Sequence, residues 1–230
     1  MKNIYIFFYF FSLFIVAENY EPFESTYEPL PPTNTIFRNA SIYDGEGNEL
    51  NNTDLIIKDG KVVAMGVDLP SSSDLIEVDA SGKWITPGII DIHSHMGVYP
   101  APSVRTSSDG NEATSPVTAE VWAEHSIWVQ DPQYALALKG GVTTFHVLPG
   151  SANLIGGRGV TAKNLQRNTI NSMKFPNAPH SLKMACGENP KRVYGNKGQS
   201  PSTRMGNAAG YRKSWIRAKS YLSKLDEYEA

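Results

Sequence analysis

Two histidines at the end of an apolar segment have the spacing that points most clearly to chemistry. The segment Pro87-Gly-Ile-Ile-Asp-Ile-His-Ser-His95 has the pattern of a strand that follows a Pro-Gly break. Side chains alternate faces along a strand, so His93 and His95 share one face with Asp91. Two imidazoles at this spacing can bind one metal ion, and imidazole suits zinc and other first-row transition metals. The alternative is a pair of hydrogen-bonded or exposed histidines, because H-x-H alone is common.

The residues before this motif predict a small β-sheet domain over residues 34–87. The expected strands are Thr35–Tyr43, Asp54–Lys58, Lys61–Met65, Leu75–Val78 and Lys83–Ile85. Asp59-Gly60 separates the second strand from the third, and this dipeptide is typical of a two-residue type I′ hairpin. Since the strands follow one another closely, we expect them to form an antiparallel sheet.

After Pro87 the pattern changes to alternating strands and helices, which is typical of a parallel α/β layout. The expected strands are Ile89–His95, Val142–Leu148 and Leu182–Cys186, and residues 150–159 are expected to form a glycine-rich loop. One helix is expected from near Pro116. A second begins at Asp131-Pro132, as N-cap and first helical residue, and ends at Gly140-Gly141.

The chain is expected to end in a helix that starts near Ser200-Pro201. Its apolar residues recur at helical spacing: Ala208, Tyr211, Trp215, Ala218, Leu222 and Leu225. An apolar stripe of this kind predicts burial against another element.

The first seventeen residues predict a signal peptide. Lys2 precedes a run of 14 mostly apolar residues, from Ile4 to Ala17, whereas a membrane-spanning helix needs about 20. The acidic, proline-rich residues 18–33 predict a flexible linker. We therefore expect a secreted protein or one in the lumen of the secretory pathway (periplasmic in a bacterium), with no stable membrane span after cleavage. The alternative is an uncleaved signal anchor.

Composition is that of an ordinary globular protein, with 40% hydrophobic and 19% charged residues among 230. A net charge of −2 gives no electrostatic case for binding nucleic acid. Cys186 is the one cysteine, which excludes a disulfide within the chain. The expected partner is a small-molecule substrate, and self-association into a homo-oligomer is left open.

Several separate blocks resemble the amidohydrolase superfamily. The segment from Gly82 to His95 is similar to its metal-binding signature, and residues 59–66 resemble the hairpin that precedes it. Residues 147–151 and 187–192 resemble an imidazolonepropionase-related subgroup. The resemblance covers about residues 35–225. It implies an α/β protein with a small N-terminal β-sandwich followed by an incomplete (β/α)8 TIM-type barrel, the barrel part covering residues 88–230.

The resemblance also implies a reaction. One or two divalent ions, with zinc favoured, activate a water molecule that attacks a carbon–nitrogen bond of a small molecule such as a dipeptide, an acyl amino acid or a cyclic amide. His93 and His95 match the first two metal ligands of the family, and Asp91 matches the acidic position beside them.

The third ligand in this superfamily is a glutamate from the third strand or a carboxylated lysine from the fourth. Glu188 follows the Leu182–Cys186 strand and is the predicted ligand, the alternative being a surface or helix-capping glutamate. Lys183 is expected to point from the wrong end of that strand. Arg158 is a candidate for contacting a substrate carboxylate, with a plain tight loop as the alternative.

The later part of the family pattern has no counterpart in these residues. The family has two further metal-binding histidines, but none follows His180, and Asp226 lies on the terminal helix. We expect the general-base aspartate beyond the C-terminus, and we expect the 230-residue chain alone to be inactive. The chain is interpreted as part of a longer hydrolase. The alternative is a truncated, non-catalytic secreted binding or scaffold protein that retains the half-barrel.

Overall fold

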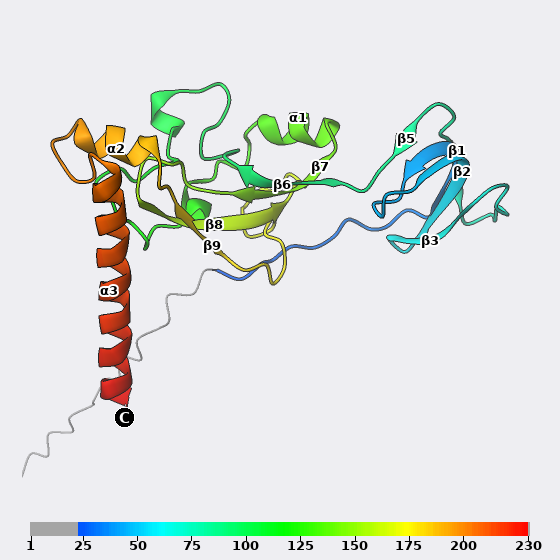
Figure 1. The fold of residues 1–230 in the computed structure, drawn as a ribbon. Coiled ribbons are helices and arrows are strands. Elements are labelled where there is room, and N and C mark those ends of the chain that lie inside the picture. Colours follow the sequence, from blue (N-terminus) through cyan, green and yellow to red (C-terminus); the bar gives the residue numbers. More distant parts are fainter. Residues whose placement is uncertain (1–22, 230) are drawn as a thin grey trace, which may run out of the picture.

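The computed structural model describes residues 23–229, so the predicted signal peptide and the first residues of the predicted linker lie outside the described part. The elements in chain order are β1 (Thr35–Tyr43), β2 (Glu49–Lys58), β3 (Lys61–Gly66), β4 (Ile76–Asp79), β5 (Trp84–Ile85), β6 (Ile89–Ser94), η1 (Arg105–Ser107), η2 (Ala123–Ser126), α1 (Gln133–Lys139), β7 (Val142–Val147), β8 (Ile155–Lys163), β9 (Ser181–Met184), α2 (Glu188–Gly195) and α3 (Arg204–Glu229). A small sheet stands at one end of a larger body that contains the helices (Figure 1).

The small sheet contains β1 to β5 in the order β3-β2-β1-β4, with β5 also paired to β1. The predicted hairpin between β2 and β3 is confirmed, because Asp59 and Gly60 both have positive φ angles, of 50° and 73°. The expected all-antiparallel pairing is wrong, because β4 and β5 both run parallel to β1. Residues 67–75 carry the chain back across the sheet after β3, so β4 starts at the same end as β1.

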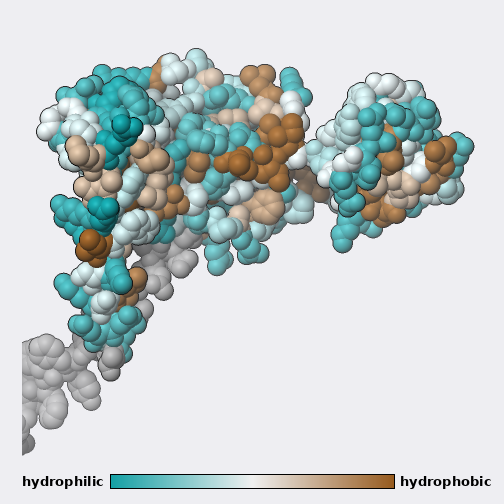
Figure 2. All heavy atoms as spheres, in the orientation of Figure 1, coloured by the Kyte–Doolittle hydropathy of each residue, from teal (hydrophilic) through white to brown (hydrophobic). Residues whose placement is uncertain are grey.

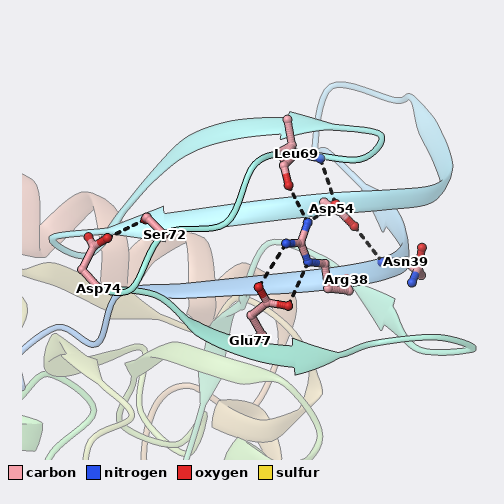
Figure 3. Close-up of polar contacts among 7 residues, drawn as sticks. All are labelled: Arg38, Asn39, Asp54, Leu69, Ser72, Asp74 and Glu77. Carbon is pink, nitrogen blue, oxygen red and sulfur yellow. Dashed lines mark hydrogen bonds and ion pairs between the residues drawn. The ribbon is translucent and has the colours of Figure 1, made fainter.

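The buried carboxylate of Asp54 and the guanidinium of Arg38 hold the connecting residues 67–75 against the sheet (Figure 3). Arg38 on β1 forms ion pairs with Asp54 on β2, at 2.7 Å, and with Glu77 on β4, at 3.2 Å. Arg38 also donates to the carbonyl of Leu69, and Asp54 accepts the backbone N–H groups of Asn39 and Leu69. Burial alone would raise the pKa of Asp54, but these hydrogen bonds outweigh it and hold the pKa below its usual value.

The larger body is built on a second sheet, in the order β6-β7-β8-β9. β6 and β7 are parallel, whereas β8 runs antiparallel to both β7 and β9. β6, β7 and β9 therefore run in one direction. The predicted fold class is confirmed: a small N-terminal β domain precedes the first part of a barrel. The purely parallel layout is wrong, because β8 lies between β7 and β9.

β8 occupies part of the segment that was expected to be a glycine-rich loop. Its glycines are explained by close packing rather than by a turn. A Cβ added at Gly157 would lie 2.5 Å from the Val121 side chain, and one at Gly159 would lie 2.7 Å from Ser181 Oγ. Glycine in a strand commonly marks such an approach of a second segment.

The predicted helix at Asp131-Pro132 is confirmed as α1, although it begins one residue later than expected, at Gln133 with Pro132 in the N-cap position. The Asp131 side chain accepts the backbone N–H of Gln133 at 3.0 Å, and Gly141, with a φ of 89°, follows the end of the helix. This side chain also accepts the N–H of Gly97, so it fixes the segment after β6 against the start of α1.

The helix expected near Pro116 is wrong, since that segment contains one 3-10 turn, η2. Val117 and Trp122 instead form isolated bridges to Ile155 and Arg158 of β8. The segment therefore runs as an extra, irregular strand beside β8, and contacts far along the chain outweigh its helical pattern.

The core of the larger body lies between β7, β8 and α1. Its fully buried members include Val98, Tyr134, Phe145, Val147 and Met173. The rings of Tyr134 and Phe145 stack with centroids 5.2 Å apart. Each large apolar side chain buried in this way stabilises the fold by about 1.5–3 kcal/mol.

Apolar side chains of β6 and of α3 remain open among the described residues. Ile89, Ile90 and Ile92 of β6 are more than half exposed. Figure 2 shows apolar surface over the region of β6 and α1. The α3 stripe is also open, because Trp215 and Leu222 are exposed on a helix that projects away from the sheet (Figure 1).

The described part of the predicted linker, residues 23–33, has no helix or strand, but it is not free. Thr26 donates its N–H to the carbonyl of Asn171, and Ser25 Oγ donates to the carbonyl of Lys174. Lys174 Nζ donates to the carbonyl of Phe23 and forms a buried ion pair with Glu124 at 2.6 Å. These contacts hold residues 23–26 along the barrel body, and the flexible linker over residues 18–33 stays a prediction. Among the described residues, no helix is both long enough and apolar enough to span a membrane.

Candidate functional site

The structure brings the two motif histidines together at the C-terminal end of β6. Their ring centroids are 5.2 Å apart, and the ring planes are nearly perpendicular. Asp91 Oδ1 accepts the backbone N–H of His93 at 3.0 Å, so the acidic residue of the motif fixes the backbone at the first histidine. The C-terminal ends of barrel strands are where (β/α)8 proteins carry their active sites.

Hydrogen bonding fixes which nitrogen of His95 is free. Its Nδ1 lies 2.8 Å from the carbonyl oxygen of Leu148, the residue after β7. A carbonyl only accepts, so Nδ1 carries the proton and Nε2 keeps its lone pair. Metal-binding histidines typically donate their other ring N–H to a carbonyl or carboxylate, which orients the ring in this way.

Lys183 on β9 reaches the same site, which the sequence analysis excluded. Its Nζ lies 3.1 Å from Nε2 of His93, so the ammonium donates to the imidazole lone pair. The expectation was wrong because β9 covers Ser181–Met184 rather than Leu182–Cys186. Lys183 is therefore next to the C-terminal end of β9, as His93 is next to the C-terminal end of β6.

The pKa values of both groups in this pair are shifted toward the neutral forms, by different causes. Burial lowers the pKa of the Lys183 amine below its ordinary value. The pKa of His93 is also lowered, first by the charge of Lys183, then by burial and by His95, against the opposing effect of Asp91. A site that disfavours protons on an imidazole and an amine favours the forms that can bind a metal.

Glu188 does not join the two imidazoles. It is the first residue of α2, and its Oε1 accepts from Arg192 Nε at 3.0 Å in an ion pair whose members are both more than half exposed. In the part of the chain that the structure describes, no group of three His, Cys, Asp or Glu side chains is placed to hold a metal ion. The ligand role of Glu188 stays a prediction.

A cavity of about 240 Å³ lies beside His95. Its walls are His95, Tyr99, Asn111, Gly150, Ser151, Ala152, Asn189, Arg192 and Val193. Three chain segments thus meet at it: the long polar loop after β6, the loop after β7, and α2. The sequence analysis did not identify Asn111 or Asn189 as site residues, and the polar composition of residues 99–115 was the only signal for the first.

The remaining candidates lie elsewhere. Arg158 stacks over the ring of Trp122, 4.4 Å from its centroid, and does not line the cavity. His125 is exposed on η2. His146 is half-buried between Thr161 and Ser181, whose hydroxyls lie 2.9 Å from Nδ1 and 2.6 Å from Nε2.

Comparison with known proteins decides the family. No protein-family model matches the chain. A solved amidohydrolase from Thermotoga maritima MSB8 is 40% identical in sequence and matches the fold with a TM-score of 0.76 over 84% of this chain. The protein named amidohydrolase tasK, from Hapsidospora irregularis, is 32% identical over 220 residues, again 84% of this chain. This chain belongs to the amidohydrolase superfamily. The predicted resemblance to the amidohydrolase superfamily is therefore confirmed.

This amidohydrolase-superfamily chain is much shorter than the proteins it matches. It spans 22% of the length of tasK and 49% of the Thermotoga chain. A dihydroorotase from Halalkalibacterium halodurans is 27% identical over 117 residues, which cover 51% of this chain and 22% of that protein. The superfamily match thus applies to the N-terminal portion of the fold, the small β domain and the first barrel strands.

Proposed function

We propose that this chain supplies part of the metal centre of a hydrolase that cleaves a carbon–nitrogen bond in a small molecule. The observation that carries the proposal is the meeting of His93, His95 and Lys183 at one edge of the second sheet. Relatives named amidohydrolase, dihydroorotase and allantoinase support the same reaction class.

The donor set fits a divalent metal ion, with zinc favoured. Nε2 of His95 has a free lone pair, and Nε2 of His93 has one that now accepts from Lys183. Neutral imidazole is a common zinc ligand. When bound, a divalent ion lowers the pKa of a coordinated water and polarises a carbonyl group. His93 and His95 would hold the ion, the Leu148 carbonyl orients the His95 imidazole, and Asp91 holds the backbone N–H of His93.

Lys183 has two forms with opposite effects at such a site. As an ammonium it repels a cation beside His93. As a neutral amine it can add to carbon dioxide, forming an N–C bond and releasing one proton, and the resulting carbamate is an anionic oxygen ligand. The superfamily resemblance includes a carboxylated lysine as a ligand, although from the fourth barrel strand. Lys183 lies on β9, which is the third strand that runs in the direction of β6. The geometry favours Lys183 over Glu188 as the third ligand.

Metal analysis tests this proposal directly. The chain is expressed, exposed to excess zinc, dialysed, and assayed for bound metal by atomic emission. We expect bound zinc in the parent chain and its loss in a His93→Ala/His95→Ala variant. His125→Ala is the matched control, since this histidine is exposed on η2. Equal zinc in the parent and the double variant contradicts the proposal.

The predicted secretory location also remains a proposal, supported by residues 1–17 alone. Its test is the N-terminal sequence of the protein recovered outside the cytoplasm. A mature chain that begins after Ala17 supports cleavage, and a chain that keeps Met1 contradicts it.

A further inference from the structure

We propose that the cavity beside His95 binds a carboxylate group of the substrate, with Arg192 as its cationic anchor. This inference rests on the proposed function for the position of the scissile bond, and it names the substrate class as N-acyl amino acids or short peptides with a free carboxylate. The proposal begins with charge. Among the residues that line the cavity, Arg192 is the one with a fixed charge.

The other walls of the cavity are uncharged groups that suit a carboxylate. Asn189 donates its side-chain N–H to Ser151 Oγ, and its Oδ1 lies 3.4 Å from Arg192 Nη2. These three side chains form one polar row along the cavity wall. Arginine presents planar N–H donors that match a carboxylate in a bidentate manner.

The two loops that line the cavity beside α2 are held in place without a ligand. Asn111 donates to the Tyr99 hydroxyl and accepts the backbone N–H of Ala152 at 2.9 Å. Gly150 donates its N–H to the carbonyl of Gly110 at 2.7 Å. A Cβ at Gly150 would lie 2.1 Å from the Asn111 amide and 2.6 Å from the Tyr99 hydroxyl, so any larger residue would have to displace these side chains. A preformed cavity lowers the ordering cost of binding a small molecule.

Arg192 already has a carboxylate partner in this structure, so its guanidinium is placed to bind a group of this kind. The partner is Glu188, four residues earlier on α2, and both side chains are more than half exposed. Exposed ion pairs contribute little to stability, so a substrate carboxylate can compete for the guanidinium. His95 lines the same cavity, which places the anchor beside the proposed metal site.

The test compares two probes that differ in one charge, N-acetylglycine and N-acetylglycinamide. Each is titrated into the chelator-treated chain, and binding is followed by the NMR signals of the Asn111 and Asn189 side-chain amides and of Arg192 Nε. We expect the acid to bind at least about tenfold more tightly than the amide, since hydrogen bonds to charged groups are the strong ones. Arg192→Met removes this preference, and Arg192→Lys retains part of it.

Two further variants make the test specific. Arg217→Met, on the projecting part of α3, is the matched control and should leave the preference unchanged. Glu188→Gln should increase the preference, because it frees the guanidinium. Equal binding of the two probes, or a preference that survives in Arg192→Met, overturns the inference.

Because the two probes are titrated into the metal-free chain, the result for the carboxylate site does not depend on the proposed metal centre. A His93→Ala variant, which leaves every residue of the cavity wall in place, should lose zinc and keep the preference for the acid. A chain that fails to bind zinc but prefers the acid contradicts the metal centre alone. A chain that binds zinc through His93 and His95 but shows no Arg192-dependent preference contradicts the carboxylate site alone.

Discussion

The side-chain nitrogen of Lys183 lies 3.1 Å from Nε2 of His93, although 90 residues separate them in the sequence. β6 carries the imidazole and β9 carries the amine, and two strands lie between them in the sheet order. The contact therefore spans the concave side of the half-barrel. It is the relationship on which the proposed metal centre depends.

Removing the Lys183 charge should raise the pKa of His93. Lys183 is the largest cause of the lowered His93 pKa, ahead of burial and of His95. A Lys183→Met variant loses that repulsion, so the protonated imidazole becomes easier to form. An NMR titration of the metal-free chain measures the pKa, with Lys163→Met, whose amine lies over the Phe175 ring, as the control. A His93 pKa that stays the same or falls in Lys183→Met contradicts the contact.

His146 should make the fold less stable in mild acid. Its pKa is lowered first by burial, then by His180 and His93, so the folded protein binds the proton less readily than the unfolded chain. Stability contributed by neutral His146 is complete above the unfolded pKa of about 6.5 and decreases as the pH falls below it. Urea unfolding at pH 7.5 and 5.5 should show a smaller pH-dependent loss in His146→Gln than in the parent. An equal loss in both contradicts the assignment.

Breaking the buried ion pair between Glu124 and Lys174 should destabilise the barrel body. The two side chains are 1% and 5% exposed and their charged atoms are 2.6 Å apart. Lys174→Met leaves a buried carboxylate without its partner, which costs about 3–5 kcal/mol.

The double variant Glu124→Gln/Lys174→Met serves as the control for that cost, since it removes both charges and should recover much of the lost stability. Chemical unfolding of the single and double variants measures the difference. If Lys174→Met is as stable as the parent, Glu124 and Lys174 do not form a buried ion pair in solution.

Gly157→Ala should destabilise β8. Gly157 has a φ of 110°, and an added Cβ would lie 2.5 Å from both the side chain and the carbonyl oxygen of Val121. Strained backbone of this kind costs about 1–3 kcal/mol before the clash is included. Gly187→Ala is the matched control, because its φ is −102° and nothing lies within 4 Å. Thermal unfolding should separate the two, and equal melting temperatures would contradict the packing of Val121 against β8.

Features with a local cause could be predicted from the sequence. The hairpin at Asp59-Gly60 needs two positive φ angles, and the start of α1 needs Asp131 two residues before a free N–H. The motif strand with His93 and His95 was likewise found from its alternation and its Pro-Gly break. Each of these signals lies within a few residues of the structure that it specifies.

Features that depend on distant pairing could not be predicted in this way. Lys183 was excluded because the strand was expected one residue later at its start and two residues later at its end, and a small shift of this kind changes which end a residue occupies. β8 was mistaken for a loop because its glycines are required by Val121 and Ser181, which lie outside the segment. Asn111 and Arg192 lie on different segments of the chain that come together only at the cavity. No local sequence pattern could therefore link them.

Anomalous diffraction from zinc-soaked crystals of the chain tests the central claim most directly. The account predicts one zinc peak about 2.0–2.1 Å from Nε2 of both His93 and His95, with Lys183, neutral or carboxylated, turned toward it. A chain that binds zinc elsewhere, or that leaves both Nε2 atoms free of metal at saturating zinc, contradicts the assignment of this site.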